Sequence, residues 1–568
     1  MSDMIYGTDD IYSSGFTVNT TLNLKNQIAA QNTMERYIAY ANRTYQRSST
    51  ERQNEAFKIY TPITELLTLV LDLNELKVSE QRNEALALST YTKTINPIID
   101  VISLVSGIDT LKVGIANKAN AVAKSNVGKN VIEGTMIAIE NSTGYITSLV
   151  GGSKFDGENQ FIRAVQAKLQ PGSSFKPLYY SAAIDSRQFT PSSIISDTPI
   201  VFHTADGKPY IPQNFRGEWK GDVELWYALA HSMNVPSLKI LDGIGFDTAI
   251  NRAIALLGIP EEEVPYRGFV PGYPIGLGVC SVRPIELAHA YACFANGGKE
   301  VIPIAIRSVE DKNGNVFLNP EKELRQKQQA KGAESQIISP QTAYTMTKLL
   351  ENTVKSGTLA GPTGNGSKFT YRDSKGKKYT IPAAGKTGTT QNWADAWTAC
   401  FTPYYTSIFW FGFDKPGQSL GLQLTGSTLA GYAMASFMQK AHEGLPFKDF
   451  VKPSNGTVEV SVCSVSGALP TEECGGHTIS LTFLEGTQPT ELCSFHSGNS
   501  AGRLLGIYRL EQELYKAGFA SDLIIKDDNP LTFDLEGKGN SDSSIGSSYD
   551  FLQEDEFGNA PDYNYLLD

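Results

Sequence analysis

A serine and a lysine lie three residues apart in the stretch PGSSFKP and could together perform nucleophilic chemistry. If Ser173 begins a helix, Lys176 lies on the same face one turn later, where its amine can reach the serine hydroxyl. A serine hydroxyl needs an adjacent base before it can attack a carbonyl carbon. A lysine can be that base if burial or neighbouring cations lower its pKa enough to leave part of it neutral. The same spacing also fits an N-cap serine followed by a surface lysine, so this pair alone decides nothing.

A second short motif lies further along the chain in the stretch HSMNVPSL. Ser232 and Asn234 flank one apolar residue there, so in an extended turn both side chains would point to the same side. The hydroxyl could relay a proton, and the side-chain amide could bind an amide of a substrate. Such a triplet occurs often in loops, and it gains meaning only from its neighbours.

The third motif is the stretch AAGKTGTT, whose Gly-Lys-Thr letters also occur in phosphate-binding loops. A phosphate loop has another glycine five residues before its second one, and Thr380 occupies that position here. Threonines and a glycine after Lys386 favour a strand over the helix that such a loop enters. The cation and the hydroxyls of Thr387 and Thr389 suit a carboxylate, and Gly388 would let a ligand approach the backbone closely.

Ser-x-x-Lys, Ser-x-Asn and Lys-Thr-Gly in this order are the motif set of penicillin-binding proteins and serine β-lactamases. Longer stretches extend the similarity. The sequence resembles the transpeptidase domain of class A penicillin-binding proteins in RAVQAKLQPGSSFKPLYYSAAID, IGLGVCSVRPIELAHAYACFANGGK and AGKTGTTQNWADAWTACFTP. The stretch GFTVNTTLNLKNQ is similar to the connecting segment that precedes this domain in that family. The resemblance covers residues 131–444 well, the connector moderately and the segment after residue 449 loosely.

The resemblance implies a peptidoglycan D,D-transpeptidase that cross-links stem peptides through a serine acyl-enzyme and is inhibited by β-lactams. It also implies D-Ala-D-Ala carboxypeptidase activity, in which water is the acceptor. It makes Ser173 the nucleophile, Lys176 the base and Ser232 the proton relay. It assigns substrate binding to Asn234, Lys386, Thr387, Gly388 and Thr389. The implied partners are stem peptides, β-lactams and other proteins of cell-wall synthesis. The implied location is the extracytoplasmic face of the bacterial cytoplasmic membrane. The implied processes are cell-wall biogenesis and the maintenance of cell shape.

Two other functions share these motifs. A serine β-lactamase would need an additional base for rapid deacylation, usually a glutamate between the second and third motifs. The run Glu261 to Glu263 has the right place in the sequence but resembles a solvated loop, and Glu286 lies in the stretch PIELAHAYA, which resembles a structural helix of the family. The third possibility is a non-catalytic module that senses penicillin or serves as a scaffold.

The implied fold is a mixed α/β (α+β) domain of the penicillin-binding transpeptidase and serine β-lactamase type, an antiparallel sheet flanked by helices. The stretch TMIAIENSTGYITSLVGG predicts a hairpin at the edge of that sheet. We expect five regions along the chain: 1–47 a connector strand and helix, 48–125 a helical insertion, 126–448 the transpeptidase domain, 449–500 a small β-rich segment, and 501–568 an acidic solvated tail.

Composition narrows the class of protein. A formal net charge of −11 argues against a nucleic-acid partner, and six histidines without a zinc-protease motif or a Cys-x-x-Cys pair argue against a metal enzyme, so no metal and no cofactor are expected. No signal peptide or membrane-spanning run occurs, so membrane attachment would require an anchor outside this chain. Cys463, Cys474 and Cys493 gather in the β-rich segment, where two of them could pair in an oxidising compartment.

Overall fold

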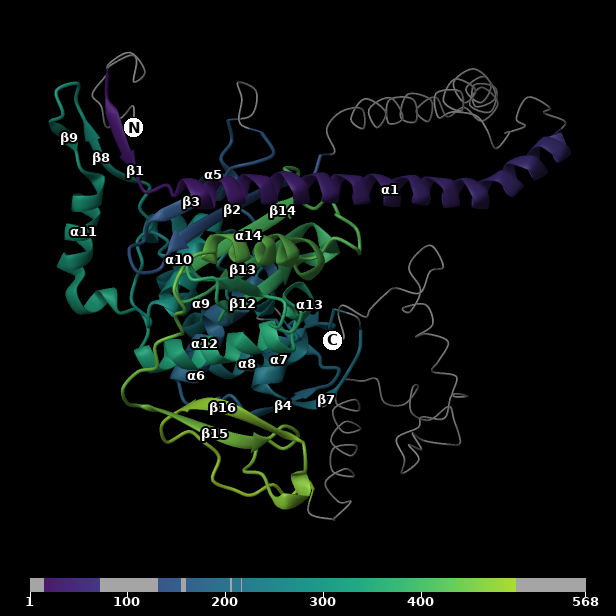
Figure 1. The fold of residues 1–568 in the computed structure, drawn as a ribbon. Coiled ribbons are helices and arrows are strands. Elements are labelled where there is room, and N and C mark those ends of the chain that lie inside the picture. The colour runs from purple at the N-terminus through teal and green to yellow at the C-terminus, as the bar shows by residue number, and fades with distance from the viewer. Residues whose placement is uncertain (1–14, 72–130, 155–159, 205–206, 216, 497–568) are drawn as a thin grey trace. The chain divides into compact units, whose positions relative to one another are not determined.

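The computed structural model describes residues 15–71, 131–154, 160–204, 207–215 and 217–496, with side chains described up to Ser48 in the first of these ranges (Figure 1). Most of them, through residue 39 and from residue 133 on, belong to one compact unit, and the described residues 40–71 and 131–132 belong to a second. In the second unit the Asn42 side chain bonds both the backbone N–H and the carbonyl of Ile132, at 2.8 and 2.9 Å. The expected regions around 72–125 and 501–568 lie outside the described residues.

The first unit is built on a five-stranded antiparallel sheet with the strand order β12-β13-β14-β2-β3. Its strands are β2 (Glu133–Glu140), β3 (Ile146–Val150), β12 (Ala384–Thr389), β13 (Asp395–Phe401) and β14 (Tyr405–Gly412). Every residue of β14 is buried, because helices cover both faces of the sheet. β2 and β3 form the edge hairpin that the alternating sequence predicts, and the sheet confirms the expected fold class.

Helices pack on both faces of this sheet, and alternate residues of β14 show which helix lies on which face. Phe409 contacts Phe437 of α14 (Tyr432–His442), with ring centroids 5.9 Å apart. Ile408 and Trp410 point the other way, into the core formed with α6 (Lys176–Asp185), α8 (Asn234–Ile244), α9 (Phe246–Leu257), α10 (Pro284–Ala295) and α12 (Pro340–Lys355). The remaining helices are α1 (Leu24–Leu71), α5 (Arg163–Gln166), α7 (Leu225–Ala230), α11 (Pro320–Lys331) and α13 (Ala360–Thr363).

Short helical turns and small sheets complete the unit. The turns are η4 (Gly172–Phe175), η5 (Glu261–Tyr266), η6 (Tyr273–Leu277), η7 (Gly332–Ser335), η8 (Gln391–Trp393), η9 (Gly426–Gly431, a π-helical turn) and η10 (Glu472–Cys474). The sheets pair β4 (Ile194–Asp197) with β7 (Gly221–Glu224), β5 (Phe202–His203) with β6 (Pro209–Tyr210), β10 (Thr370–Arg372) with β11 (Lys378–Thr380), and β15 (Thr457–Cys463) with β16 (Thr478–Leu484).

The N-terminal connector forms a strand, as its β-branched alternation predicts. β1 (Thr17–Thr20) pairs with β8 (Ile306–Glu310), which in turn pairs with β9 (Val316–Leu318). The Thr21 hydroxyl donates to the carbonyls of Ile146 and Ile304, at 2.9 and 2.7 Å, and thereby links the connector to the edge strand of the main sheet. The helix that follows, α1, is continuous across residue 47, where we expected one region to end and the next to begin.

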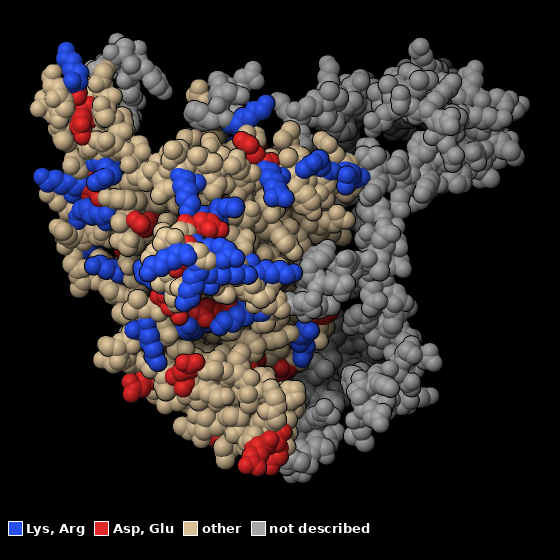
Figure 2. All heavy atoms as spheres, in the orientation of Figure 1, with Lys and Arg blue, Asp and Glu red and all other residues tan. Residues whose placement is uncertain are grey.

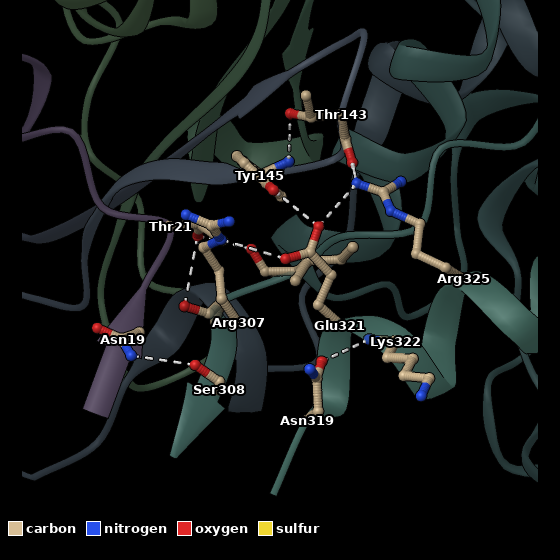
Figure 3. A network of polar contacts seen from close by, with 12 residues as sticks. Asn19, Thr21, Thr143, Tyr145, Arg307, Ser308, Asn319, Glu321, Lys322 and Arg325 are labelled. Atoms are coloured by element: carbon tan, nitrogen blue, oxygen red, sulfur yellow. Dashed lines mark hydrogen bonds and ion pairs between the residues drawn. The ribbon is translucent and has the colours of Figure 1, made fainter. Parts of the chain in front are cut away.

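A polar network links this small sheet to α11 (Figure 3). The Tyr145 hydroxyl donates to Glu321 at 2.7 Å, and the guanidinium groups of Arg307 and Arg325 lie 5.7 and 5.8 Å from the Tyr145 ring centroid. Arg307 also donates to Glu321, and Arg325 donates to the carbonyl of Thr143 at 2.6 Å. Hydrogen bonding to Glu321 raises the pKa of Tyr145. One tyrosine thus joins the β2–β3 turn to α11.

Lysine and arginine side chains gather across the middle of the face drawn in Figure 2, although the whole sequence carries a formal net charge of −11. Acidic residues greatly outnumber basic ones in the sequence after residue 501. The negative net charge of the sequence therefore does not mean that every surface of the transpeptidase-like unit is negatively charged. Within the described residues, no helix is both long and apolar enough to cross a membrane.

A buried ion cluster joins η5 to α10. Arg267 is 0% exposed and binds both Glu263 and Glu286, while Arg283 binds the same two carboxylates. Glu286 also accepts the backbone N–H of Arg283 at 2.7 Å, which caps α10. Of the glutamates considered as a deacylating base, Glu263 and Glu286 are therefore held by arginines.

We predict that Arg267→Met lowers the free energy of unfolding by about 3 kcal/mol, the low end for breaking a buried ion pair, because Arg283 still binds Glu286. Urea unfolding followed by intrinsic fluorescence measures this change. Arg307→Met is the matched control: its ion pair with Glu321 is exposed, and little measurable change is expected. Equal stability of the wild type and Arg267→Met would contradict a stabilising role for the cluster.

Candidate active site

Ser173 lies on η4, a single turn of 3-10 helix that continues directly into α6. Gly172 before it has φ +56°, a left-handed conformation that glycine adopts without strain, and a Cβ on this residue would lie 2.9 Å from the carbonyl oxygen of Thr389. The tight turn brings residues i and i+3 onto one line, so Lys176 follows Ser173 on the same side. Ser173 is half-buried, and its hydroxyl forms no hydrogen bond with any described residue.

Lys176 is fully buried and bonds the second motif. Its Nζ donates to the carbonyls of Ser232 and Met233, at 2.7 and 2.9 Å, and to Oδ1 of Asn234 at 2.9 Å. Burial, and secondly the positive charge of Lys386, hold the pKa of Lys176 well below its ordinary value. We expected Nζ to contact the Ser173 hydroxyl. In the structure its hydrogen bonds with described residues go to the second motif, so its role as base for Ser173 stays a prediction.

Ser232 connects the two buried lysines. Its carbonyl accepts from Lys176, and its hydroxyl accepts from Lys386 Nζ at 2.6 Å. The residue has φ +60°, an uncommon conformation for a non-glycine residue, which lets carbonyl and hydroxyl serve the two amines. The role of this hydroxyl as a proton relay stays a prediction.

Lys386 is also fully buried, on β12. Besides Ser232, its Nζ donates to the carbonyl of Thr387 at 3.0 Å, and burial lowers the pKa of Lys386 to about 7. We expected this ammonium to bind a carboxylate directly. In the structure two of its three N–H donors go to a hydroxyl and a carbonyl of the protein, and carboxylate binding by Lys386 stays a prediction.

Asn234 orients Lys176 and leaves little capacity for a ligand. Its Oδ1 accepts from Lys176, and its Nδ2 donates to the carbonyl of Gln213 at 3.0 Å. Of its two N–H donors and two acceptor lone pairs, one of each remains. Substrate binding by Asn234 stays a prediction, now limited to one donor and one acceptor position.

Asn214 has a positioning role that sequence reasoning missed. Its Oδ1 accepts the backbone N–H groups of Asn234 and Val235, at 2.9 and 3.2 Å, and so satisfies donors in the first turn of α8. Its Nδ2 donates to buried Asp197 at 2.7 Å and to the carbonyl of Glu218. No spacing relates Asn214 to the second motif in the sequence, so only the fold reveals the contact.

β12 lies directly against the turn that carries Ser173. A Cβ on Gly388 would lie 2.4 Å from the carbonyl oxygen of Pro171 and 3.1 Å from the backbone nitrogen of Ser174. We expected Gly388 to admit a ligand. The structure gives another reason for the glycine, because the close neighbour is the backbone of η4. This approach brings the backbone of Thr389 next to Gly172 and hence next to the nucleophile.

The hydroxyl groups of the two threonines of β12 differ in their hydrogen bonds. Thr387 donates to Thr358 Oγ1 at 2.7 Å. Thr389 accepts the backbone N–H of Gly426 at 3.1 Å, and its own O–H proton is bonded to no described residue. Thr389 therefore keeps a donor available beside Ser173.

Two aromatic side chains flank the motifs and were not singled out from the sequence. Phe215 follows Asn214, Trp393 follows the third motif on η8, and their ring centroids lie 5.9 Å apart at an interplanar angle of 70°. Phe215 is 55% exposed, and Trp393 has φ +50°. An edge-to-face pair between segments next to two motifs could shape the entrance to the nucleophile.

Comparison with known proteins agrees with this geometry. Residues 134–412 match the family model of the penicillin-binding protein transpeptidase domain, and residues 453–498 match that of the penicillin-binding protein 1A C-terminal domain. Penicillin-binding protein 1A of Pseudomonas aeruginosa is 32% identical over 376 residues, which are 59% of this chain and 43% of the relative. The chain thus spans about half the length of the curated relatives it matches.

Solved structures share the fold. Penicillin-binding protein 1A from Haemophilus influenzae superposes with a TM-score of 0.53 at 23% identity, over 64% of this chain and 54% of the other. PonA1 of Mycobacterium tuberculosis has a TM-score of 0.50 at 20% identity, over 79% of this chain and 91% of the other. This chain therefore contains a penicillin-binding protein transpeptidase domain at residues 134–412 and a penicillin-binding protein 1A C-terminal domain at residues 453–498.

Proposed function

We propose that this chain catalyses peptidoglycan D,D-transpeptidation with Ser173 as the nucleophile. The observation that carries the proposal is the convergence at one turn of helix of two buried lysines, β12 and a hydroxyl that bonds none of the described residues. Ser173 Oγ would attack the carbonyl of the penultimate D-alanine of a stem peptide, and the C–N bond to the last D-alanine would break. The amine of a second stem would then displace the serine and form the cross-link.

Proton transfer in this reaction is assigned to the buried groups. Neutral Lys176 takes the proton of Ser173 Oγ as the C–O bond forms, and Ser232 passes a proton to the departing amine of D-alanine. The backbone N–H groups of Ser173 and Thr389 stabilise the oxyanion, a role for which their close approach across Gly172 gives support. Burial, and secondly the charge of Lys386, keep the pKa of this base low.

Water in place of the acceptor amine would make the same acyl-enzyme a D,D-carboxypeptidase. The balance between the two activities depends on which acceptor reaches the ester. Because the substrate is cell-wall peptidoglycan, the proposed place of action is the outer face of the cytoplasmic membrane, where the chain would meet stem peptides, β-lactams and other cell-wall synthesis proteins.

The first prediction concerns the nucleophile. Penicillin incubated with the chain should give one covalent adduct on the peptide that contains Ser173, and Ser173→Ala should abolish it. Ser174→Ala is the matched control, since the Ser174 hydroxyl only donates to the carbonyl of Pro171 at 2.7 Å, and it should keep the adduct. Mass spectrometry of tryptic peptides measures both.

A cross-linking assay with a pentapeptide donor and an amine acceptor completes this experiment. Cross-linked product that disappears in Ser173→Ala supports transpeptidation. Rapid hydrolysis of penicillin would identify a β-lactamase, stable labelling without peptide turnover would identify a sensor, and an adduct in Ser173→Ala would refute the assignment of the nucleophile.

The second prediction is a pH dependence. Lys176 must be neutral to act as base, so acylation should rise as pH increases through the depressed pKa of this residue. The Lys386 charge contributes to that depression, so Lys386→Met should raise the pKa of Lys176 and move the acid limb of the profile to higher pH. Lys386→Arg keeps the charge and should leave the limb in place.

The readout is the pH midpoint of the acid limb, which is measured from β-lactam acylation rates at a series of pH values. Loss of a proton relay would lower the acylation rate without moving this midpoint. Burial is the larger cause of the low pKa of Lys176 and persists in both variants, so the midpoint should stay below 10.5. A midpoint that is the same in Lys386→Met and the wild type would contradict the coupling of the two lysines.

The third prediction concerns recognition of the donor's terminal carboxylate. A charge-assisted hydrogen bond contributes about 1.5–3 kcal/mol, so Thr389→Val should slow acylation by carboxylate-bearing donors about ten- to a hundredfold. The same substitution should slow acylation by a donor with an amidated C-terminus much less. Thr389→Ser retains the hydroxyl and should restore most of the rate. Equal losses with both donors would show that this hydroxyl does not recognise the carboxylate.

A further inference from the structure

Three cysteines and one histidine converge at the end of the C-terminal β segment that lies away from the main sheet. We call Cys463, Cys474, Cys493 and His496 the cysteine cluster; its four potential ligand atoms all lie within 4.8 Å of one another. Cys463 ends β15, Cys474 ends η10, and the other two follow β16 on the last described segment (Figure 1). Three separate segments thus bring donor atoms to one point.

The distances fit a tetrahedral ion. The sulfurs of Cys463 and Cys493 each lie 3.5 Å from Nδ1 of His496. Zinc bonds of about 2.3 Å to sulfur and 2.1 Å to nitrogen give S···N edges of about 3.6 Å in a tetrahedron. These two edges are therefore already close to the length that a bound zinc ion would impose.

The surroundings suit thiolate ligands. Cys463 and Cys474 are 0% exposed and Cys493 is 3% exposed. The backbone N–H of Thr471 donates to Cys474 Sγ at 3.3 Å, and the Ser466 hydroxyl donates to Cys493 Sγ at 3.1 Å. Donors of this kind orient metal-bound sulfurs and partly neutralise their charge.

The histidine ring is held with Nδ1 toward the sulfurs. The ring of His496 stacks on that of His477, with centroids 5.5 Å apart and an interplanar angle of 10°. Phe495 packs edge-on against the same ring and also lines the apolar side of the cluster. A stacked ring loses rotational freedom before a ligand arrives, which favours binding.

A disulfide accounts for these residues less well. All six cysteines of the sequence are described, and each is a free thiol. A bond between two members of the cysteine cluster would leave the third thiol and His496 without a function, whereas a metal ion uses all four donors. We had expected no metal because the sequence has no Cys-x-x-Cys pair, but here the spacings are 10, 18 and 2 intervening residues and only the fold brings the ligands together.

We propose that the cysteine cluster binds one zinc ion in a closed, structural Cys3His site. Binding releases the thiol protons, so that three thiolates and a neutral imidazole surround the ion and the site carries one net negative charge. Three sulfurs and one nitrogen in tetrahedral array fill the coordination sphere, which leaves no position for a substrate. The site is therefore stabilising and takes no part in acyl transfer.

The packing of the C-terminal β segment indicates what a bound zinc ion would stabilise. A two-stranded hairpin is marginally stable alone. Val462, Leu481 and Phe483 anchor β15 and β16 in the main core, but the loops beyond them have only the cysteines, Val465, Ala468 and Phe495 as an apolar cluster. A zinc ion would close these loops where hydrophobic burial is small.

The test is the metal content of the full chain, purified without a metal-affinity tag from zinc-supplemented medium and dialysed against EDTA. Inductively coupled plasma mass spectrometry should find one zinc per chain in the wild type. Cys493→Ser and His496→Ala should lose most of it. Cys280→Ser makes the same chemical change at a buried thiol outside the cluster and should keep the full content.

Two measurements on the wild type guard against a variant that fails to fold. A mercurial reagent that blocks thiols should release zinc in proportion to the cysteines it titrates. Zinc release should coincide with faster proteolysis within residues 453–496. Penicillin labelling of Ser173 should persist throughout. The proposal is overturned if the wild type contains no zinc, if a Cys463, Cys474 and Cys493 triple serine variant retains it, or if the intact mass under non-reducing conditions is two hydrogens short because a disulfide has formed.

Discussion

The candidate active site depends on the direct contact between β12 and the helical turn that carries Ser173. Two glycines permit it: Gly388 faces the carbonyl of Pro171, and Gly172 faces the carbonyl of Thr389, both at distances that no Cβ could occupy without displacing backbone. Backbone against backbone is the closest approach that two elements can make. It brings two sets of N–H groups to one point beside Ser173, and side chains of any size would separate them.

That contact also encloses two lysines, whose electrostatics follow from burial. Lys176 and Lys386 are each fully buried, and no carboxylate is hydrogen-bonded to either amine among the described residues. Carbonyls, a hydroxyl and an amide oxygen replace water around the two amines, so the ammonium forms are supported but not neutralised. Two cations without a counter-ion disfavour each other, so the charge of Lys386 adds to burial in lowering the pKa of Lys176. The proposed role of Lys176 as a base depends on this lowered pKa.

The sequence predicted the fold class of this domain, because the three motifs and the strand alternation depend on local spacing. It could not predict that Asn234 would hold Lys176, since that contact joins residues far apart in the chain. For the same reason Asn214 was missed, and so was the packing of Gly388 against the backbone of Pro171. The sequence showed Cys463, Cys474 and Cys493 gathered in one segment, but only the fold brings His496 to the same point.

One helix relates the catalytic and C-terminal parts of the chain. Thr353 of α12 donates to the carbonyl of Gly385 on β12 at 2.7 Å, and the core residues Met346 and Leu350 of α12 belong to the same cluster as Phe483 of β16. The near end of the C-terminal hairpin is therefore part of the core that supports β12, while the cysteine cluster is separate from it. Local opening costs only the contacts of the region that opens. The loops around the cluster can thus open while α12 and β12 stay packed, so the glycine contact beside Ser173 does not depend on the cysteine cluster.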